Sequence, residues 1–262
     1  ASQQPGGSQV GPADQRVASV GVDRSWVPSV PRLSIDSAQQ SKDPMCLPTG
    51  DVYGDFFIRS EIGRGAFGVV YLAEQLSLSR TVALKVTDTN QDDGCCVEGQ
   101  TMAQLEHPSI VRVFAQLTDT VNQRRMLCMQ YVSGINLRSL IKINQERNGD
   151  HWNGSSLLRI LDEGVNEEDV VLRETSVADR NSLVAADKLA TVCWIGAQAA
   201  FALDHAHQAG YIHHDVKPEN TIINRFGRPM LVDFNLSHDI VAGGRSTLMV
   251  GGTLPYLAPE HL

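Results

Sequence analysis

The sequence lacks the features that mark membrane, disulfide-rich and nucleic-acid-binding proteins. Its most apolar stretch, residues 189–203, is interrupted by Thr191 and Gln198 and is shorter than the ~20 apolar residues that span a bilayer. The five cysteines are an odd number without C-x-x-C spacing, which indicates neither a disulfide framework nor a zinc site. No basic block exceeds the Arg124-Arg125 pair and the net charge is -8, which argues against binding to a phosphate backbone. We therefore expect a cytoplasmic protein with no membrane segment in this chain and no nucleic-acid partner.

The rest of the composition is that of a globular domain behind a polar leader. Of the 262 residues, 42% are hydrophobic and 20% are charged, as in ordinary soluble domains. Residues 1–50 differ, because Ser, Gln, Pro and Gly make up half of them and such a segment buries too little apolar surface to offset chain entropy. We interpret residues 1–52 as a disordered leader. The alternative is a strap that docks on the domain behind it.

The first half of the domain has the pattern of a small sheet with one helix. Three runs rich in Val, Ile, Phe and Tyr follow Asp55 and predict antiparallel strands, namely FFIRSEI, GVVYLAEQ and RTVALKV. Residues 94–105 are predicted to form a helix that ends before the His107-Pro108 step. The apolar runs IVRVFAQL and MLCMQYV predict two further strands.

The second half has helical periodicity and an acidic insertion. Residues 144–187 hold 10 Asp and Glu against 4 Lys and Arg, so we interpret them as an acidic, partly disordered insertion, with a dedicated partner surface as the alternative. Further on, apolar residues at three- and four-residue spacing predict a helix that packs this stripe on the core and stops at Gly210. The stripe consists of Leu189, Val192, Gly196, Ala199, Ala200 and Leu203.

A glycine-rich stretch lies between the first two predicted strands. Gly63, Gly65 and Gly68 have G-x-G-x-x-G spacing, and glycine lets a turn fold close over phosphate oxygens with backbone N–H groups as donors. The spacing alone is a weak signal, because dinucleotide-binding turns share it. Those turns run from a strand into a helix, whereas a strand follows here. We therefore expect a lid between two strands.

A lysine is expected inside the third strand. Lys85 belongs to the apolar string V-A-L-K, where a buried ammonium without a partner would be costly. Glu98, on the predicted helix, is the nearest acidic candidate besides Asp88, Asp92 and Asp93 in the intervening loop. The alternative is a solvated lysine at a strand end.

Four polar residues lie close together in the sequence near its C-terminal end. The strings Y-I-H-H-D-V-K-P-E-N and L-V-D-F-N place Asp215, Lys217, Asn220 and Asp233 within 19 positions. Phosphoryl transfer needs a carboxylate to orient a hydroxyl, oxygen ligands for magnesium and a cation on the moving phosphate. Any one of them could be an ordinary loop residue, but their joint occurrence with the glycine loop and V-A-L-K favours a phosphotransferase.

In their order from Gly63 to Glu260, these motifs resemble those of the eukaryotic-type Ser/Thr protein kinases, including their bacterial relatives. The resemblance implies an α+β, two-lobed fold: a complete β-rich N-lobe with its hinge at residues 53–132, and a helical C-lobe at residues 133–262, truncated after Ala258-Pro259-Glu260. It implies ATP and Mg²⁺ as cofactors. The residues that would bind the nucleotide are Ile62, Gly63, Gly65, Gly68, Val70, Ala83, Lys85, Met129, Gln130, Val132 and Asn136. The catalytic group would comprise Asp215 as the base, Lys217 on the transferred phosphate, Lys85 with Glu98, and Thr253, while Asn220 and Asp233 would hold magnesium.

The same resemblance implies the substrate. Lys217 is the Ser/Thr-type residue, and Thr253 matches the threonine that ties the substrate-binding loop to the catalytic Asp, so a protein Ser or Thr hydroxyl is the expected acceptor. Two positions depart from the family pattern: His214 replaces Arg, and Asn235 replaces the Gly of D-F-G. The rival hypothesis is a pseudokinase that binds nucleotide as a scaffold.

Overall fold

A computed structural model of the protein describes residues 45–65, 68–89, 105–147, 152–163, 174–234 and 253–256. Most of the expected leader lies outside the described residues, as do Glu98 with nearly all of its predicted helix, Asn235 and Glu260.

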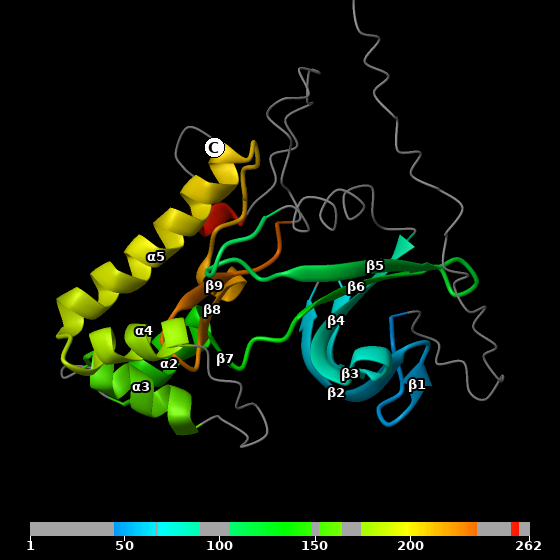
Figure 1. Ribbon diagram of the computed structural model, residues 1–262, viewed down its shortest axis with the longest axis horizontal. Helices are drawn as coiled ribbons and strands as arrows, with labels where there is room; N and C mark the ends of the chain where they lie inside the picture. The colour runs from blue at the N-terminus through cyan, green and yellow to red at the C-terminus, as the bar shows by residue number, and fades with distance from the viewer. Residues whose placement is uncertain are drawn as a thin grey trace, which may run out of the picture. The chain divides into compact units, whose positions relative to one another are not determined.

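The first lobe is a curled antiparallel sheet (Figure 1) with the strand order β1-β2-β3-β4-β6-β5. A 3-10 turn at Leu76–Leu78 joins β3 to β4. The three runs rich in Val, Ile, Phe and Tyr form β2 to β4 and the two later runs form β5 and β6, so all five predicted strands are confirmed. The strands are β1 (Val52–Tyr53), β2 (Phe56–Gly65), β3 (Gly68–Gln75), β4 (Arg80–Asp88), β5 (Val113–Asp119) and β6 (Arg124–Gln130).

The central strand β4 is buried on both of its faces. Val82, Leu84 and Val86 belong to an apolar cluster on one side of the sheet. Alternate residues of a strand point to opposite faces, so Ala83 and Lys85 point to the other side, where Ala83 joins a second cluster. This alternation explains how a lysine can lie within a continuous run of buried residues.

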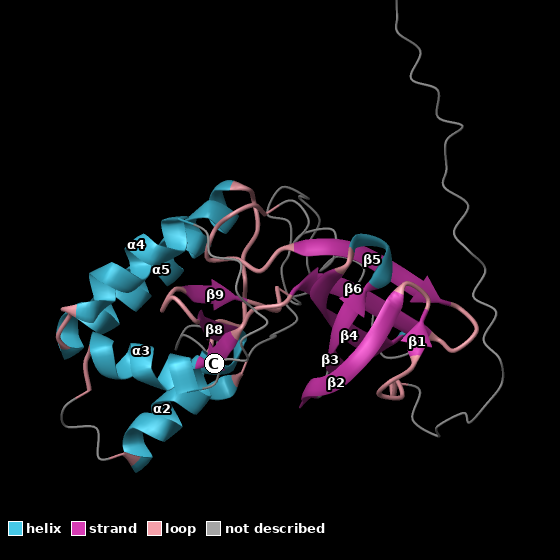
Figure 2. Cartoon of the chain, turned by 60° about the horizontal axis from the view of Figure 1, so that its bottom comes forward, coloured by secondary structure: helices cyan, strands magenta, loops and turns pink. Residues whose placement is uncertain are grey.

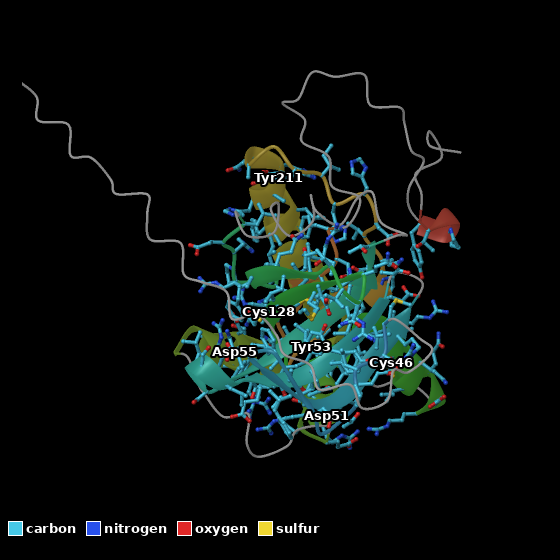
Figure 3. The ribbon with its side chains drawn as sticks, turned by 90° about the vertical axis from the view of Figure 1, so that its right-hand side faces the viewer. Cys46, Asp51, Tyr53, Asp55, Cys128 and Tyr211 are labelled. Carbon is cyan, nitrogen blue, oxygen red and sulfur yellow. The ribbon has the colours of Figure 1, made fainter. Side chains whose placement is uncertain are left out.

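The chain just before β1 docks on the first face of this sheet. Leu47 is buried, and its backbone N–H donates to the Tyr71 hydroxyl at 3.0 Å. That hydroxyl donates in turn to the carbonyl of Met45, and burial raises the pKa of Tyr71, which keeps the donor proton in place. Figure 3 shows Cys46 near the sheet that carries Cys128. Residues 45–52 therefore dock on the domain in the way that the strap alternative describes, and residues 1–44 of the expected leader lie outside the described residues.

The second lobe combines helices with a small antiparallel sheet (Figure 2), in the order β7-β8-β9. None of the helices in the described part of the chain has both the length and the hydropathy of a membrane crossing. The elements of the second lobe are β7 (Gly134–Asn136), α2 (Leu137–Glu146), α3 (Gly154–Glu163), α4 (Glu174–Val184), α5 (Lys188–Gln208), β8 (Thr221–Asn224), β9 (Pro229–Leu231), and 3-10 turns at Pro218–Asn220 and Leu254–Tyr256.

The acidic insertion is largely helical where it is described. Its helices α3 and α4 bury Leu157, Leu161 and Leu183 in a cluster with Ile223 of β8. Residues 152–163 and 174–187 are thus folded, while residues 148–151 and 164–173 lie outside the described residues, so for them partial disorder stays a prediction. The count of charges hid the pattern, because regularly spaced leucines face inward while Asp162 and Glu163 are exposed.

Helix α5 forms as predicted, but with a different face inward. Thr191, Ile195, Ala202 and Ala206 are buried, whereas Leu189 is 72% exposed and the rest of the predicted stripe is exposed or half-buried. The helix is apolar around most of its circumference, so periodicity alone does not select a face. Thr191 tolerates burial because its hydroxyl donates to the Asp187 carbonyl at 2.7 Å.

Candidate active site

The glycine-rich turn joins β2 and β3, as the strand-to-strand order requires. Gly65 pairs with Gly68 and Gly63 pairs with Val70 across the two strands. Gly68 has φ +133, and a Cβ there would lie 2.3 Å from the Val86 carbonyl oxygen. At Gly65 a Cβ would meet no atom of the described residues within 4 Å. The fold therefore demands glycine at position 68, whereas no described residue crowds position 65.

Lys85 reaches across from the first lobe to the second. Its ammonium donates to Oδ1 of Asp233 at 3.1 Å, and its side chain is 5% exposed. Asp233 has φ 60, an uncommon backbone state for a non-glycine residue and one that often marks functional sites. The sequence-based partner Glu98 lies outside the described residues, so that pairing stays a prediction.

Several of the residues expected to hold adenine share one apolar cluster. Met129 of β6 pairs with Ala83 of β4, and both lie with Val70 and Val132 in the second cluster. This cluster lies on the face of the sheet to which Lys85 points. An apolar wall beside an ammonium is suited to a ligand with a flat ring and an anionic tail.

Asp215 is the centre of a closed hydrogen-bond network. Its Oδ2 accepts from the Lys217 ammonium at 2.6 Å and from the Asn220 amide at 3.0 Å. Its Oδ1 accepts from the Thr253 hydroxyl at 3.0 Å, and Lys217 also donates to that hydroxyl at 2.8 Å. Four predicted site residues are thus brought together, and the carboxylate of Asp215 is held in one orientation.

A buried histidine joins this network to the segment before Asp233. His213 is 1% exposed, and its Nε2 lies 3.0 Å from the carbonyl oxygen of Val232. A carbonyl can only accept, so Nε2 carries the proton and Nδ1 is left to accept from the backbone N–H of Asp215 at 3.4 Å. Burial lowers the pKa of His213, which favours this neutral form. The ring also packs against Phe234, with centroids 4.3 Å apart.

The two expected magnesium ligands lie at the open end of the β8–β9 hairpin. Asn220 directly precedes β8, and its carbonyl accepts from the N–H of Val232 at 3.0 Å. Asp233 follows Val232. The hairpin therefore brings Asn220 and Asp233 to the same end of the sheet, and their side chains offer oxygen ligands of the kind that Mg²⁺ prefers.

The remaining residues expected to bind the nucleotide are Ile62, Gln130 and Asn136, and they differ in exposure and in contacts. Ile62 is 47% exposed on β2, next to Gly63. The Gln130 backbone N–H donates to the Arg112 carbonyl at 2.8 Å, which fixes the end of β6. Asn136 is the N-cap of α2, where its side chain accepts from Ser139 at 2.8 Å. The structure thus gives Asn136 a local role in the fold.

Sequence reasoning assigned no role to His213 or to Arg228. The string H-H-D contains two histidines, and only burial distinguishes His213 from the exposed His214, which has φ 61. Arg228 lies in a short turn, where arginine is normally solvated, yet its side chain is only 17% exposed. No local pattern marks either residue.

The comparisons with known proteins agree with this geometry. The family model described as protein kinase domain matches residues 56–262. The chain is 33% identical over 210 residues to the serine/threonine-protein kinase PknK of Mycobacterium tuberculosis, covering 77% of this chain and 15% of that protein. It is 30% identical over 211 residues to the serine/threonine-protein kinase PknB of Mycolicibacterium smegmatis, covering 76% of this chain and 27% of that protein. It is 25% identical to the Arabidopsis thaliana kinase AtPK1/AtPK6, covering 79% of this chain and 36% of that protein.

This chain therefore spans about a third or less of the length of these relatives. The family match covers more than half of the chain and includes every described element after β1. A curled N-lobe sheet, a lysine on its central strand and an aspartate-centred loop network accompany that match. The chain belongs to the protein kinase domain family.

Proposed function

We propose that the protein is a serine/threonine kinase, which transfers the γ-phosphate of ATP to a Ser or Thr hydroxyl of a protein. The observation that carries the proposal is the network of Asp215, Lys217, Asn220 and Thr253, in which a carboxylate is held by three donors. A carboxylate oriented in this way is suited to accept a proton from an incoming hydroxyl.

In this proposal the nucleotide lies between the glycine turn and the apolar cluster. Gly63, Gly65 and Gly68 cover the phosphates with their backbone N–H groups. The adenine packs against the wall formed by Val70, Ala83, Met129 and Val132, with Ile62 and Gln130 at its edges. Support comes from the lack of any described atom within 4 Å of a Cβ at Gly65 and from the position of Lys85 on the same face of the sheet as the apolar cluster.

The oxygen ligands present fit magnesium. The Asn220 amide nitrogen is used by Asp215, so its Oδ1 is the atom that would bind the metal, together with the carboxylate of Asp233. When bound, Mg²⁺ neutralises charge on the phosphate oxygens. Lys85, which is already held against Asp233, contributes a second positive charge to the same phosphates.

The chemical step then follows from the position of each side chain. The substrate hydroxyl oxygen forms a bond to the γ-phosphorus, while the bond from that phosphorus to the β–γ bridging oxygen breaks and ADP leaves. Asp215 accepts the proton of the hydroxyl. Lys217 lies 2.6 Å from the Asp215 carboxylate, which supports a role for its ammonium in stabilising charge on the moving phosphoryl group.

The class of substrate follows from Lys217 and Thr253. Thr253 bonds to both Asp215 and Lys217, which supports a role for Thr253 in presenting a peptide to the proposed base. We propose a protein acceptor and a cytoplasmic location, and no nucleic-acid partner given the net charge of -8.

The experiment compares the wild-type protein with Asp215→Asn and Asp204→Asn, using radiolabelled ATP and a generic basic protein. Asp204 is the matched control, because it is an exposed aspartate on α5 whose carboxylate accepts from the Gln208 side-chain amide at 2.7 Å. We expect Asp215→Asn to lower kcat by about 10²–10⁴, the usual contribution of a positioned base, and Asp204→Asn to leave it unchanged. Calorimetry with a non-hydrolysable ATP analogue should give the same affinity for all three proteins. Nucleotide binding without any transfer by the wild type would overturn the proposal and favour the scaffold hypothesis.

A further inference from the structure

The turn between β8 and β9 is covered by the inserted helix α4. A Cβ on Gly227, at the tip of this turn, would lie 2.1 Å from Leu183 Cδ1, and Gly227 has φ +88. Arg180 of α4 donates to the carbonyl of Arg225 at 2.9 Å and forms an ion pair with Asp162 of α3. Helix and turn are therefore in direct contact over both backbone and side chains.

Arg228 makes the strongest connection between the turn and its surroundings. Its Nε and Nη2 donate to the two carboxylate oxygens of Asp179 on α4, each at 2.6 Å. Its Nη1 donates to Gln198 of α5 at 2.7 Å and approaches the Ser109 hydroxyl at 3.4 Å. The guanidinium also lies 5.8 Å from the centre of the Trp194 ring. A two-bond arginine–carboxylate pair of this kind fixes orientation as well as distance.

The other end of the same hairpin carries the metal-ligand candidates. Strands β8 and β9 pair Thr221 with Leu231 and Ile223 with Pro229, and Asn220 and Asp233 flank the open end. Asn220 is four residues from Asn224, the last residue of β8 before the turn, or ~13 Å at strand spacing. A short, fully paired hairpin is stiff enough to transmit a tilt of its turn to its open end.

We propose that Arg228 is a positioning residue, which ties the inserted helix α4 to the β8–β9 turn and thereby holds Asn220 and Asp233 in place. The inference rests on the proposed kinase function. It assigns the acidic insertion a role: Asp179 supplies the carboxylate that Arg228 requires, and Leu183 packs beneath the turn. Arg228 touches neither nucleotide nor protein substrate in this proposal and acts only through the hairpin.

The first test does not depend on activity. Hydrogen–deuterium exchange is measured at the Val232 amide, which donates to Asn220 at the open end, in the wild type, Arg228→Met and Asp179→Asn. We expect exchange at least tenfold faster in both variants. The control is Arg147→Met, which breaks the exposed ion pair with Glu163 on α3, away from the hairpin, and should leave Val232 unchanged. Equal exchange in the wild type and Arg228→Met would overturn the inference, whether or not the protein phosphorylates anything.

The second test uses steady-state phosphotransfer at a temperature well below the unfolding midpoint. Arg228→Met and Asp179→Asn should each raise the half-saturating Mg²⁺ concentration at least threefold and lower kcat about tenfold, and the double variant should be no worse than either single one. Arg228→Lys keeps the charge but not the two-bond geometry, so it should fold and show an intermediate Mg²⁺ requirement. A lower unfolding midpoint with unchanged kcat and Mg²⁺ requirement would show a purely structural residue and overturn the inference.

Discussion

The hydroxyl of Thr253 donates to the carboxylate of Asp215 at 3.0 Å, although the two residues are 38 positions apart. Lys217 donates to the same hydroxyl, so Thr253 bridges the base and the cation of the proposed reaction. The segment around Thr253 is thereby anchored to the loop that carries Asp215.

This bridge predicts a specific effect of removing the hydroxyl. Thr253→Val should lower kcat roughly 10- to 100-fold, because a hydrogen bond to a charged group contributes about 1.5–3 kcal/mol. Thr253→Ser keeps the hydroxyl and should retain most of the activity. Nucleotide affinity, measured by calorimetry, should be equal in both variants, since the hydroxyl of Thr253 bonds to Asp215 and Lys217, which we assign to the chemical step rather than to the nucleotide. Equal kcat for the two variants would contradict the bridging role.

Two glycines of the nucleotide turn should respond differently to a methyl group. Gly68→Ala should lower the free energy of unfolding by about 1–3 kcal/mol, because the Cβ would overlap the Val86 carbonyl. Gly65→Ala should change it by less than ~0.5 kcal/mol, yet weaken ATP binding by filling the space that we assign to the phosphates. Urea unfolding and calorimetry separate the two effects. Unimpaired ATP binding by Gly65→Ala would count against that assignment.

The insertion should contribute to stability through its buried leucine. Leu183 is fully buried and Val184 is 54% exposed on the same helix. Leu183→Ala should therefore lower the free energy of unfolding by about 2–5 kcal/mol, and the neighbouring Val184→Ala should lower it by less than ~0.5 kcal/mol. Thermal or urea unfolding gives the comparison. A similar, small effect at both positions would mean that α4 is not part of the folded core.

His213 makes stability depend on pH. Burial lowers its pKa below the ordinary value of 6.5, although Asp233 and Asp215 partly oppose the shift. The unfolded chain therefore binds this proton more readily than the folded protein, so the free energy of unfolding falls as the pH drops below about 6.5. Urea unfolding at pH 5.5 and 7.5 should show a larger loss for the wild type than for His213→Gln, which cannot titrate. Parallel losses would exclude His213 as a source of the acid sensitivity.

Local patterns in the sequence were sufficient to predict strands β2 to β6 and the polar residues of the Asp215 loop. Strand periodicity, glycine positions and short motifs are signals that lie within a few residues of each other, and these parts of the fold depend mainly on such signals. The inward face of α5 and the helices of the insertion depend on which surfaces meet in three dimensions. Leu189 and Ile195 are equally apolar in the sequence, yet only Ile195 finds a partner surface. Arg228 was missed for the same reason, since its partners Asp179 and Gln198 come from two separate helices.

The alternation along β4 has a consequence for folding as well as for catalysis. A slip of β4 by one residue against its neighbours would turn Lys85 into the apolar cluster of Leu47, Tyr71 and Phe56, away from Asp233. The ammonium would then be buried without a countercharge, which costs several kcal/mol, and Val82, Leu84 and Val86 would lose their packing. The residue that we assign to the phosphates thus also penalises misaligned sheets, so selection for the reaction and selection for correct strand alignment act on the same side chain.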